Sequence, residues 1–198
     1  MEWAKRECIL VAATKAFSKL GFKKASVDDI AKEAGVAKGT VYLACESKED
    51  LFYQAVHREL RAWIAQIAQM VDPRVGADEL LRQVAAAGFA YLEQHPLVRD
   101  LFLGILHGQL PGWAHRFDQL RALGQQNIVE ILKLGIAQKR FRHDLDVEET
   151  AMILQDMTLA GYLFQNREGQ TSRAHRERRL KAGLDLVLHG LQAAESSS

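Results

Sequence analysis

The 198-residue sequence has few of the features that mark a secreted, membrane-spanning or metal-binding protein. It holds only two cysteines, Cys8 and Cys45, which fit no metal-ligand spacing and cannot form a disulfide framework. No apolar run reaches the roughly 20 residues that a membrane span needs, because Gln155 and Asp156 interrupt the richest stretch, 151–164. The first ten residues mix acids with bases and lack a cleavage site of small residues. We therefore expect two free thiols, no membrane segment and a cytoplasmic location.

Motifs of catalysis are also missing from the sequence. The seven histidines form no H-E-x-x-H motif, and Glu-x-x-His pairs, which a di-metal helical bundle needs on two helices, are not found. No phosphate-binding glycine loop or nucleophile elbow is present. We predict that the protein is not an enzyme, has no catalytic residues and holds neither a metal nor a cofactor.

Proline is scarce, and strand-like alternation is absent. The three prolines, Pro73, Pro96 and Pro111, each separate segments whose apolar residues recur at helical spacing. Several of these segments begin with a capping residue, such as Ser26, Ser47 or Asp146, followed by an acid three residues on. The pattern predicts an all-α protein of about nine helices. The expected helices cover residues 3–20, 27–34, 38–45, 48–71, 77–94, 97–107, 112–138, 147–166 and 173–194.

Residues 26–45, SVDDIAKEAGVAKGTVYLAC, have the spacing of a helix-turn-helix. Small Ala31 lets two helices cross closely, and Gly35 can adopt the positive φ that a tight turn needs. The second helix contains poor helix formers such as Gly39 and Thr40. Contact with DNA explains this composition better than helix propensity does. An ordinary helical hairpin with a glycine turn stays an alternative on this spacing alone. The residues expected to hold the two helices together are Ile30, Ala31, Gly35, Val41 and Cys45.

The overall charge of +1 conceals a basic N-terminal region. Lysines concentrate in the first fifty residues, including Lys23, Lys24, Lys38 and Lys48, while the acids there cluster at helix starts. Phosphate binding depends on a basic face rather than on the charge of the whole protein. A total charge close to zero therefore does not exclude a nucleic-acid partner.

The pattern extends on both sides of the helix-turn-helix. Its positions are Arg6, Ile9, Leu10, Ala12, Ala13, Phe17, Gly21, Phe22, Ser26, Val27, Ile30, Ala31, Ala34, Gly35, Val36, Gly39, Thr40, Val41, Tyr42, Ser47, Lys48 and Leu51. This pattern resembles the TetR family of transcriptional regulators over about the first sixty residues. The resemblance implies a DNA-binding domain over residues 1–47 and a ligand-binding and dimerisation domain over 48–198. It also implies a homodimeric repressor that a small molecule releases from a palindromic DNA operator.

The resemblance assigns roles to residues by position. It implies phosphate contacts from Ser26, Thr40, Tyr42 and Lys48, and base contacts from Lys38, Gly39 and Leu43. Ala44 and Cys45 depart from the family pattern, which often has aromatic rings or His at these places, and Lys139 stands near a position where the family often has a helix-ending Gly. We predict that Cys45 is buried near Phe17, with Phe22 or Leu51 filling the space. Because of this departure, a helical adaptor or a ligand-binding protein that has lost DNA binding stays an alternative.

The C-terminal helices carry broad apolar faces, and the resemblance to the TetR family implies that they form a dimer. The last two expected helices, 147–166 and 173–194, could pack against their copies in a second chain as a four-helix bundle. An intrachain core is the alternative for the same residues. The residues expected at the dimer interface are Leu154, Gly161, Leu180, Leu184, Val187, Leu188 and Leu191.

The resemblance also implies a pocket for a small hydrophobic or amphipathic ligand among the middle helices. Each candidate lining residue also fits a plain core position. Two polar residues, His107 and Gln155, would orient a ligand. The candidates are Trp63, Ile67, Phe89, Phe102, Leu106, His107, Phe117, Gln155 and Met157.

Overall fold

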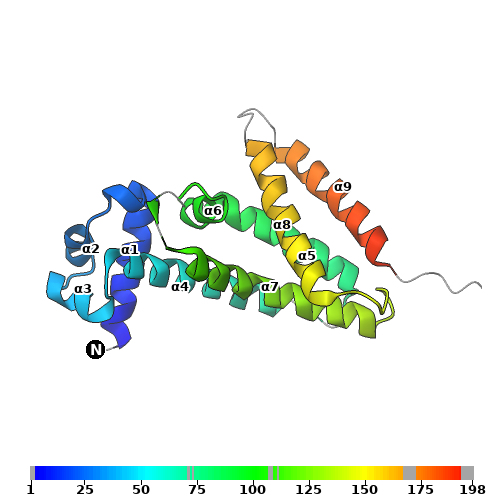
Figure 1. The fold of residues 1–198 in the computed structure, drawn as a ribbon, viewed down its shortest axis with the longest axis horizontal. Helices are drawn as coiled ribbons and strands as arrows, with labels where there is room; N and C mark the ends of the chain where they lie inside the picture. Colours follow the sequence, from blue (N-terminus) through cyan, green and yellow to red (C-terminus); the bar gives the residue numbers. More distant parts are fainter. Residues whose placement is uncertain are drawn as a thin grey trace, which may run out of the picture. The chain divides into compact units, whose positions relative to one another are not determined.

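A computed structural model of the chain describes residues 3–70, 72, 74–106, 109–110, 112–166 and 173–192. These residues confirm the all-α prediction (Figure 1). Their helices are α1 (Trp3–Lys24), α2 (Val27–Glu33), α3 (Lys38–Ala44), α4 (Lys48–Met70), α5 (Ala77–Gln94), α6 (Pro96–Phe102), α7 (Ala114–Ala137), α8 (Val147–Asn166) and α9 (Arg173–Leu191). None of the described helices is both long and apolar enough to cross a membrane.

Two helix ends, those of α1 and α6, differ from the predicted ones by four residues or more, and a glycine lies close to each. Helix α1 extends to Lys24, but its backbone is non-helical at Gly21 (φ 74°, ψ 166°), directly after the predicted end at residue 20, and helical turns resume after this kink. Helix α6 ends at Phe102 instead of residue 107 because Gly104 adopts a φ of 75°. A glycine at positive φ is a common way to end a helix.

The predicted helix caps are confirmed at three helix starts. In each, the backbone N–H three residues further on donates to the side-chain oxygen of the capping residue. The donor–acceptor distances are 3.1 Å at Ser26, 3.0 Å at Ser47 and 3.1 Å at Asp146. Each bond satisfies one of the N–H groups that the first turn of a helix leaves without a partner.

Packing divides the chain into two compact units. Unit 1 contains Met1–Trp63 and Leu92–Leu120, and unit 2 contains Ile64–Tyr91 and Arg121–Ser198. Helices α4, α5 and α7 therefore contribute residues to both units. The expected domain boundary between residues 47 and 48 stays a prediction.

Unit 1 has an aromatic core around Phe52, which is fully buried. The Phe52 ring centroid lies 5.1 Å from that of Phe17, 5.3 Å from that of Phe22 and 5.3 Å from that of Trp113. These rings join α1, the first turns of α4 and the residue before α7. Helix α1 also packs against α2, and α2 packs against α3, so the aromatic core supports the helix-turn-helix.

Unit 2 has an aliphatic core in which Phe141 is the one buried aromatic residue of the described cluster. Its buried members are Ala77, Leu80, Leu81, Val129, Ile131, Leu132, Phe141, Leu145, Ala151, Leu154, Leu188 and Leu191. The Phe141 ring lies directly on Gly135, where a Cβ atom would overlap its carbons. The chain returns to Gly135 through a Schellman motif, in which Lys139 takes a φ of 58° and the Arg140 N–H donates to the Gly135 carbonyl at 2.9 Å.

Candidate nucleic-acid interface

The turn between α2 and α3 has the geometry that the sequence predicts. Gly35 adopts a φ of 67°, the Gly35 N–H donates to the Lys32 carbonyl at 3.1 Å, and the Val36 N–H donates to the Ala31 carbonyl at 3.0 Å. These bonds form a Schellman motif with glycine in the left-handed position. The turn fixes the direction in which α3 leaves α2.

The inner side of this pair of helices is apolar and closed. Ile30 and Val41 are fully buried, and Ala31 is 4 % exposed. Cys45 is 5 % exposed, which confirms its predicted burial, and its thiol donates to the Val41 carbonyl at 3.3 Å. Burial, together with the negative charge of Asp50, raises the pKa of the Cys45 thiol to about 11. The role of Phe17, Phe22 or Leu51 in filling the space beside Cys45 stays a prediction.

The outer side of α3 is exposed, although it carries two large side chains. Leu43 is 79 % exposed and Tyr42 is 47 % exposed. Lys38 and Gly39 are also exposed, and Thr40 is half-buried. Apart from its chain neighbours and the backbone of its own helix, a Cβ atom at Gly39 would meet no atom within 4 Å. The fold itself therefore gives no reason for glycine at this helical position.

Two of the predicted contact residues are held by neighbouring groups at the start of α2. The Lys38 Nζ lies 2.8 Å from the Asp28 Oδ2, and this hydrogen bond raises the pKa of Lys38. The Ser26 hydroxyl caps α2 and donates to the Asp29 carboxylate at 2.6 Å. Lys38 is the first residue of α3 and Ser26 caps α2, and both side chains already have partners within the chain.

Lys48 lies at the junction between α1 and α4. Its Nζ donates to the Lys23 carbonyl at 3.2 Å and lies 4.7 Å from the centroid of the Phe22 ring. A cation at the end of α1 complements the partial negative charge of the last carbonyls. Lys23 and Lys24 in the same turn add positive charge there.

A polar network that the sequence analysis missed holds the C-terminal end of α3. The Gln54 amide donates to the Ala44 carbonyl at 3.1 Å and to the Asp50 carboxylate at 2.8 Å. The same carboxylate accepts from the Glu46 N–H at 3.1 Å, and Arg116 lies 3.4 Å from it. The spacing of Asp50 and Gln54, four residues apart on one helix, is a local indication of their contact. Nothing local indicates the contributions of Ala44 and Arg116.

The predicted pocket residues are divided between the two units. Trp63, Phe102, Leu106 and Phe117 belong to unit 1, whereas Ile67, Phe89, Gln155 and Met157 belong to unit 2. His107 lies outside the described residues. Phe102 and Phe117 lie together, with their ring centroids 5.7 Å apart. Met157 is 45 % exposed and lines a groove on α8 and α9 instead.

The predicted interface residues fall into two groups within unit 2. Leu188 and Leu191 are buried in the core of that unit, which favours the intrachain alternative for these two. Leu154 belongs both to that core and to the groove on α8 and α9, which has a volume of about 150 Å³. The remaining predicted residues also line the groove: Gly161, Leu180, Leu184 and Val187.

Similarity to known proteins identifies the family of the chain. A family model described as "Bacterial regulatory proteins, tetR family" matches residues 9–55. The fatty acid metabolism regulator protein of Bacillus subtilis is 31 % identical to this chain over 141 residues, an alignment that covers 70 % of this chain and 72 % of that protein. The chain belongs to the TetR family. The resemblance that the sequence indicates is therefore confirmed.

Other TetR-family relatives extend the comparison. The HTH-type transcriptional repressor KstR2 of Mycolicibacterium smegmatis is 27 % identical over 168 residues, covering 78 % of this chain and 76 % of that protein. The crystal structure of FadR from Bacillus subtilis in complex with stearoyl-CoA superimposes with a TM-score of 0.76 at 20 % identity, covering 94 % of this chain and 99 % of that one. This last likeness concerns the fold. The relatives of this TetR-family chain are transcriptional regulators, not enzymes.

Proposed function

We propose that this TetR-family protein is a homodimeric transcriptional repressor that binds a near-palindromic DNA operator and leaves it when a small molecule binds. Residues 1–47 would form the DNA-binding domain and residues 48–198 the ligand-binding and dimerisation domain. The observation that carries the proposal is the outer face of α3, where glycine and large exposed side chains have no explanation within the fold.

Gly39 supports DNA contact most directly. Glycine inside a helix costs about 0.5–1 kcal/mol relative to alanine, and it is used where a backbone must approach a ligand closely. No neighbouring protein atom occupies the space beside Gly39. The first turn of a recognition helix lies over base edges in the major groove, where a bare backbone allows close approach. Leu43 lies one turn further along the same helix. Its exposed side chain would be covered by the bases.

Charged and polar groups around α3 would hold the phosphates. Lys48 stands beside the carbonyl end of α1, next to Lys23 and Lys24. Lys38 is 51 % exposed in its ion pair with Asp28, so it can exchange this partner for a base edge or a phosphate. Thr40 and Tyr42 add hydroxyl groups on the same helix.

The groove on α8 and α9 supports a second copy of the chain as partner. Gly161 and Gly183 lie in it, and small residues let helices approach closely. On the same pair of helices Ile153 is 56 % exposed and Leu186 is 78 % exposed. Two α8–α9 pairs would bury these residues in a four-helix bundle. A twofold dimer presents two copies of α3 to half-sites that lie about 34–36 Å apart or a multiple of that distance.

Gln155 supports a ligand site in unit 2. Its amide nitrogen donates to the Arg121 carbonyl at 3.1 Å, but its buried Oε1 has no hydrogen-bond partner among the described residues. An unsatisfied buried acceptor costs about 1–3 kcal/mol. A ligand with a hydrogen-bond donor and an apolar body would satisfy it. The ligand of the B. subtilis neighbour, stearoyl-CoA, is an amphipathic molecule of this general kind.

A selection experiment tests the DNA-binding proposal. The full chain is used to enrich duplexes from a random library, and binding to the enriched sequence is then measured over a range of salt concentrations. We expect a near-palindrome whose affinity falls steeply as salt rises, because phosphate contacts release counterions. Failure to enrich any sequence, together with binding that salt does not weaken, would support a helical adaptor or a ligand-binding protein without DNA binding.

The ligand response has its own test. Stearoyl-CoA, added to the protein bound to the enriched duplex, should lower the fraction of bound DNA if the site accepts long acyl chains. Gln155→Leu keeps a similar volume but removes the buried acceptor, so it should weaken the response while leaving DNA affinity without the ligand unchanged. An equal response of both proteins would remove Gln155 from the ligand site.

A further inference from the structure

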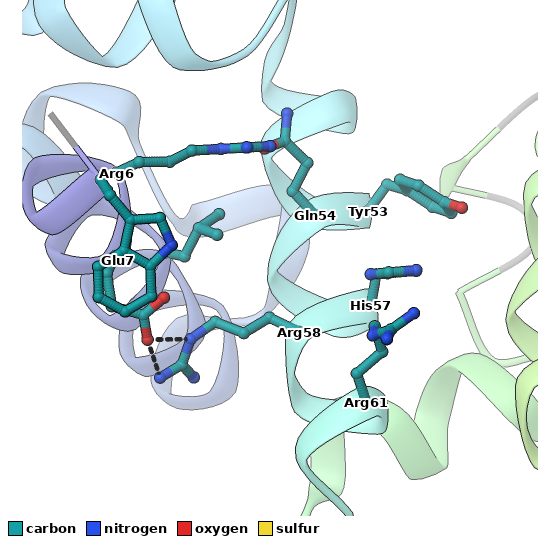
Figure 2. A pocket seen from close by; sticks show the side chains of 9 residues that line it. Arg6, Glu7, Tyr53, Gln54, His57, Arg58 and Arg61 are labelled. Atoms are coloured by element: carbon teal, nitrogen blue, oxygen red, sulfur yellow. Dashed lines mark hydrogen bonds and ion pairs between the residues drawn. The ribbon is translucent and has the colours of Figure 1, made fainter. Parts of the chain in front are cut away.

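A groove in unit 1 lies between α1 and α4 and differs in chemistry from the rest of the surface. Helix α1 lines it with residues between Trp3 and Leu10, and α4 lines it with residues between Tyr53 and Arg61 (Figure 2). Its volume is about 560 Å³, which falls within the range of small-molecule sites. Trp3 is 80 % exposed, so most of its indole ring has no protein cover.

The groove has more positive charge than its own acids neutralise. Arg58 donates to the Glu7 carboxylate at 2.6 Å (Figure 2). It also donates to the Glu59 carboxylate at 2.9 Å, so its charge is balanced. Arg6 donates at 2.9 Å to the amide oxygen of Gln54, which is neutral. Arg61 is exposed and, like Arg6, forms no ion pair with a described residue. Two guanidinium groups in the lining therefore lack a counter-charge among the residues that the structure describes.

Aromatic groups accompany these two cations. The rings of Tyr53 and His57 lie one helical turn apart on α4, with centroids 5.8 Å from each other. Burial and the charge of Arg61 lower the pKa of His57, so at neutral pH its imidazole is uncharged and offers one donor and one acceptor. Rings, an apolar floor at Leu10 and unbalanced guanidinium groups together favour a ligand with both an apolar body and an acidic group.

We propose that the groove between α1 and α4 binds an amphipathic aromatic carboxylate, whose anionic group pairs with Arg6 and Arg61 and whose ring lies against Trp3 and Leu10. A DNA backbone is the less favoured occupant. His57 is nine residues from Lys48 along α4, about 14 Å at 1.5 Å per residue, and the groove has apolar walls that phosphates do not need. This site is independent of the pocket expected in the C-terminal domain.

The groove is connected to the recognition helix by two hydrogen bonds in series. Arg6 donates to Gln54, and Gln54 donates to the carbonyl of Ala44, the last residue of α3. A carboxylate that draws Arg6 away from Gln54 would change the support of that end of α3. Occupation of the groove should therefore change DNA affinity, an effect that rests on the proposed function, whereas binding to the groove does not.

The binding test uses the full chain without DNA. 2-Naphthoate is titrated by calorimetry, and the indole N–H resonances of the three tryptophans are followed by NMR, with Trp3→Phe to assign the Trp3 signal. We expect the Trp3 resonance to shift on binding. Arg6→Gln and Arg61→Gln should each weaken binding at least tenfold, because each removes one charge-assisted contact. Lys133→Gln, which removes one exposed charge from α7 outside the groove, should leave binding unchanged.

Each opposite result overturns the proposal. The groove is not the binding site if the Trp3 resonance does not move at millimolar 2-naphthoate. The same conclusion follows if Arg61→Gln and the natural chain bind 2-naphthoate with equal affinity. Equal binding of the uncharged 2-naphthamide shows that the anionic group is not recognised. If Arg61→Gln lowers the salt dependence of DNA binding by as much as Lys48→Ala does, the groove contacts the DNA backbone instead.

Discussion

Two glycines in helices of this protein occupy opposite surroundings. Gly135, near the end of α7, lies under the ring of Phe141 with no room for a Cβ atom. Gly39, in the first turn of α3, has no atom within 4 Å of the place where a Cβ atom would lie, apart from its chain neighbours and the backbone of its own helix. Core packing explains the first glycine and cannot explain the second. Packing within the chain accounts for the glycine in α7, whereas we propose that contact with DNA accounts for the glycine in α3.

The turn after α7 has a lysine in a backbone conformation that favours glycine. Lys139 takes the left-handed conformation that Gly35 takes after α2, with the same pair of hydrogen bonds. A non-glycine residue in this conformation costs roughly 1–2 kcal/mol. The fold thus tolerates a lysine where it would favour glycine, and it carries a glycine at position 39 where alanine would be more stable.

The largest effect is expected from Gly135→Ala. The added methyl group would displace the buried Phe141 ring, and such overpacking costs about 1–3 kcal/mol in the free energy of unfolding. Urea unfolding followed by circular dichroism measures the loss. Gly190→Ala, at an open position in α9, is the matched control and should be neutral or slightly stabilising. A full-stability Gly135→Ala protein would show that the Phe141 ring has room to move.

Gly39→Ala should separate stability from function. It should raise the free energy of unfolding by about 0.5–1 kcal/mol, since alanine is the better helix former. It should also weaken DNA binding by about tenfold, or 1.4 kcal/mol, because the methyl group intrudes between α3 and the DNA. Binding to the selected duplex and urea unfolding give the two values. If the affinity for DNA stays the same while the free energy of unfolding rises, the proposal that Gly39 approaches DNA closely is wrong.

Lys139→Gly should stabilise the protein, whereas Gly135→Ala should destabilise it. It removes the conformational strain of the left-handed lysine but adds freedom to the unfolded chain, so the net gain should be about 0.5–1 kcal/mol. The midpoint of thermal unfolding measures it, and DNA affinity should not change. A loss of stability would mean that the Lys139 side chain makes a contact worth more than the strain.

Lys48→Ala should have the smallest effect of the four. Lys48 contacts the Lys23 carbonyl and the Phe22 ring and would also meet a phosphate, so it belongs to the fold and to the interface. Loss of one phosphate contact in each half-site should weaken binding to all duplexes alike and reduce the salt slope by about 1 per half-site. Lys38→Ala is the comparison, because it should also relax base preference. Equal base preference in both variants would remove Lys38 from direct readout.

The sequence predicts those parts of this structure that depend on neighbours along the chain. Apolar spacing located the helices, Ser26 and Ser47 identified two starts, and Gly35 identified the turn before α3. Each of these is decided within one or two helical turns. The burial of Cys45 followed from the family pattern around it, which fixes the inner side of α3.

Contacts between distant segments could not be predicted in this way. The packing of the Phe141 ring on Gly135 depends on the chain folding back through the turn at Lys139. The bonds from Arg6 to Gln54 and from Gln54 to Ala44 depend on how α1, α3 and α4 pack. The expected pocket residues were chosen by apolar character alone, and this property does not distinguish a cavity wall from a core.

The central claim, that two copies of α3 read one DNA site, is tested most directly by chemical interference on the selected duplex. Guanines and adenines are methylated, and duplexes bound by the full chain are separated from unbound ones. The account predicts two blocks of interfering major-groove positions, related by a twofold axis and separated by one helical turn of DNA or a multiple of it. A single block, or interference confined to the minor groove, would contradict it.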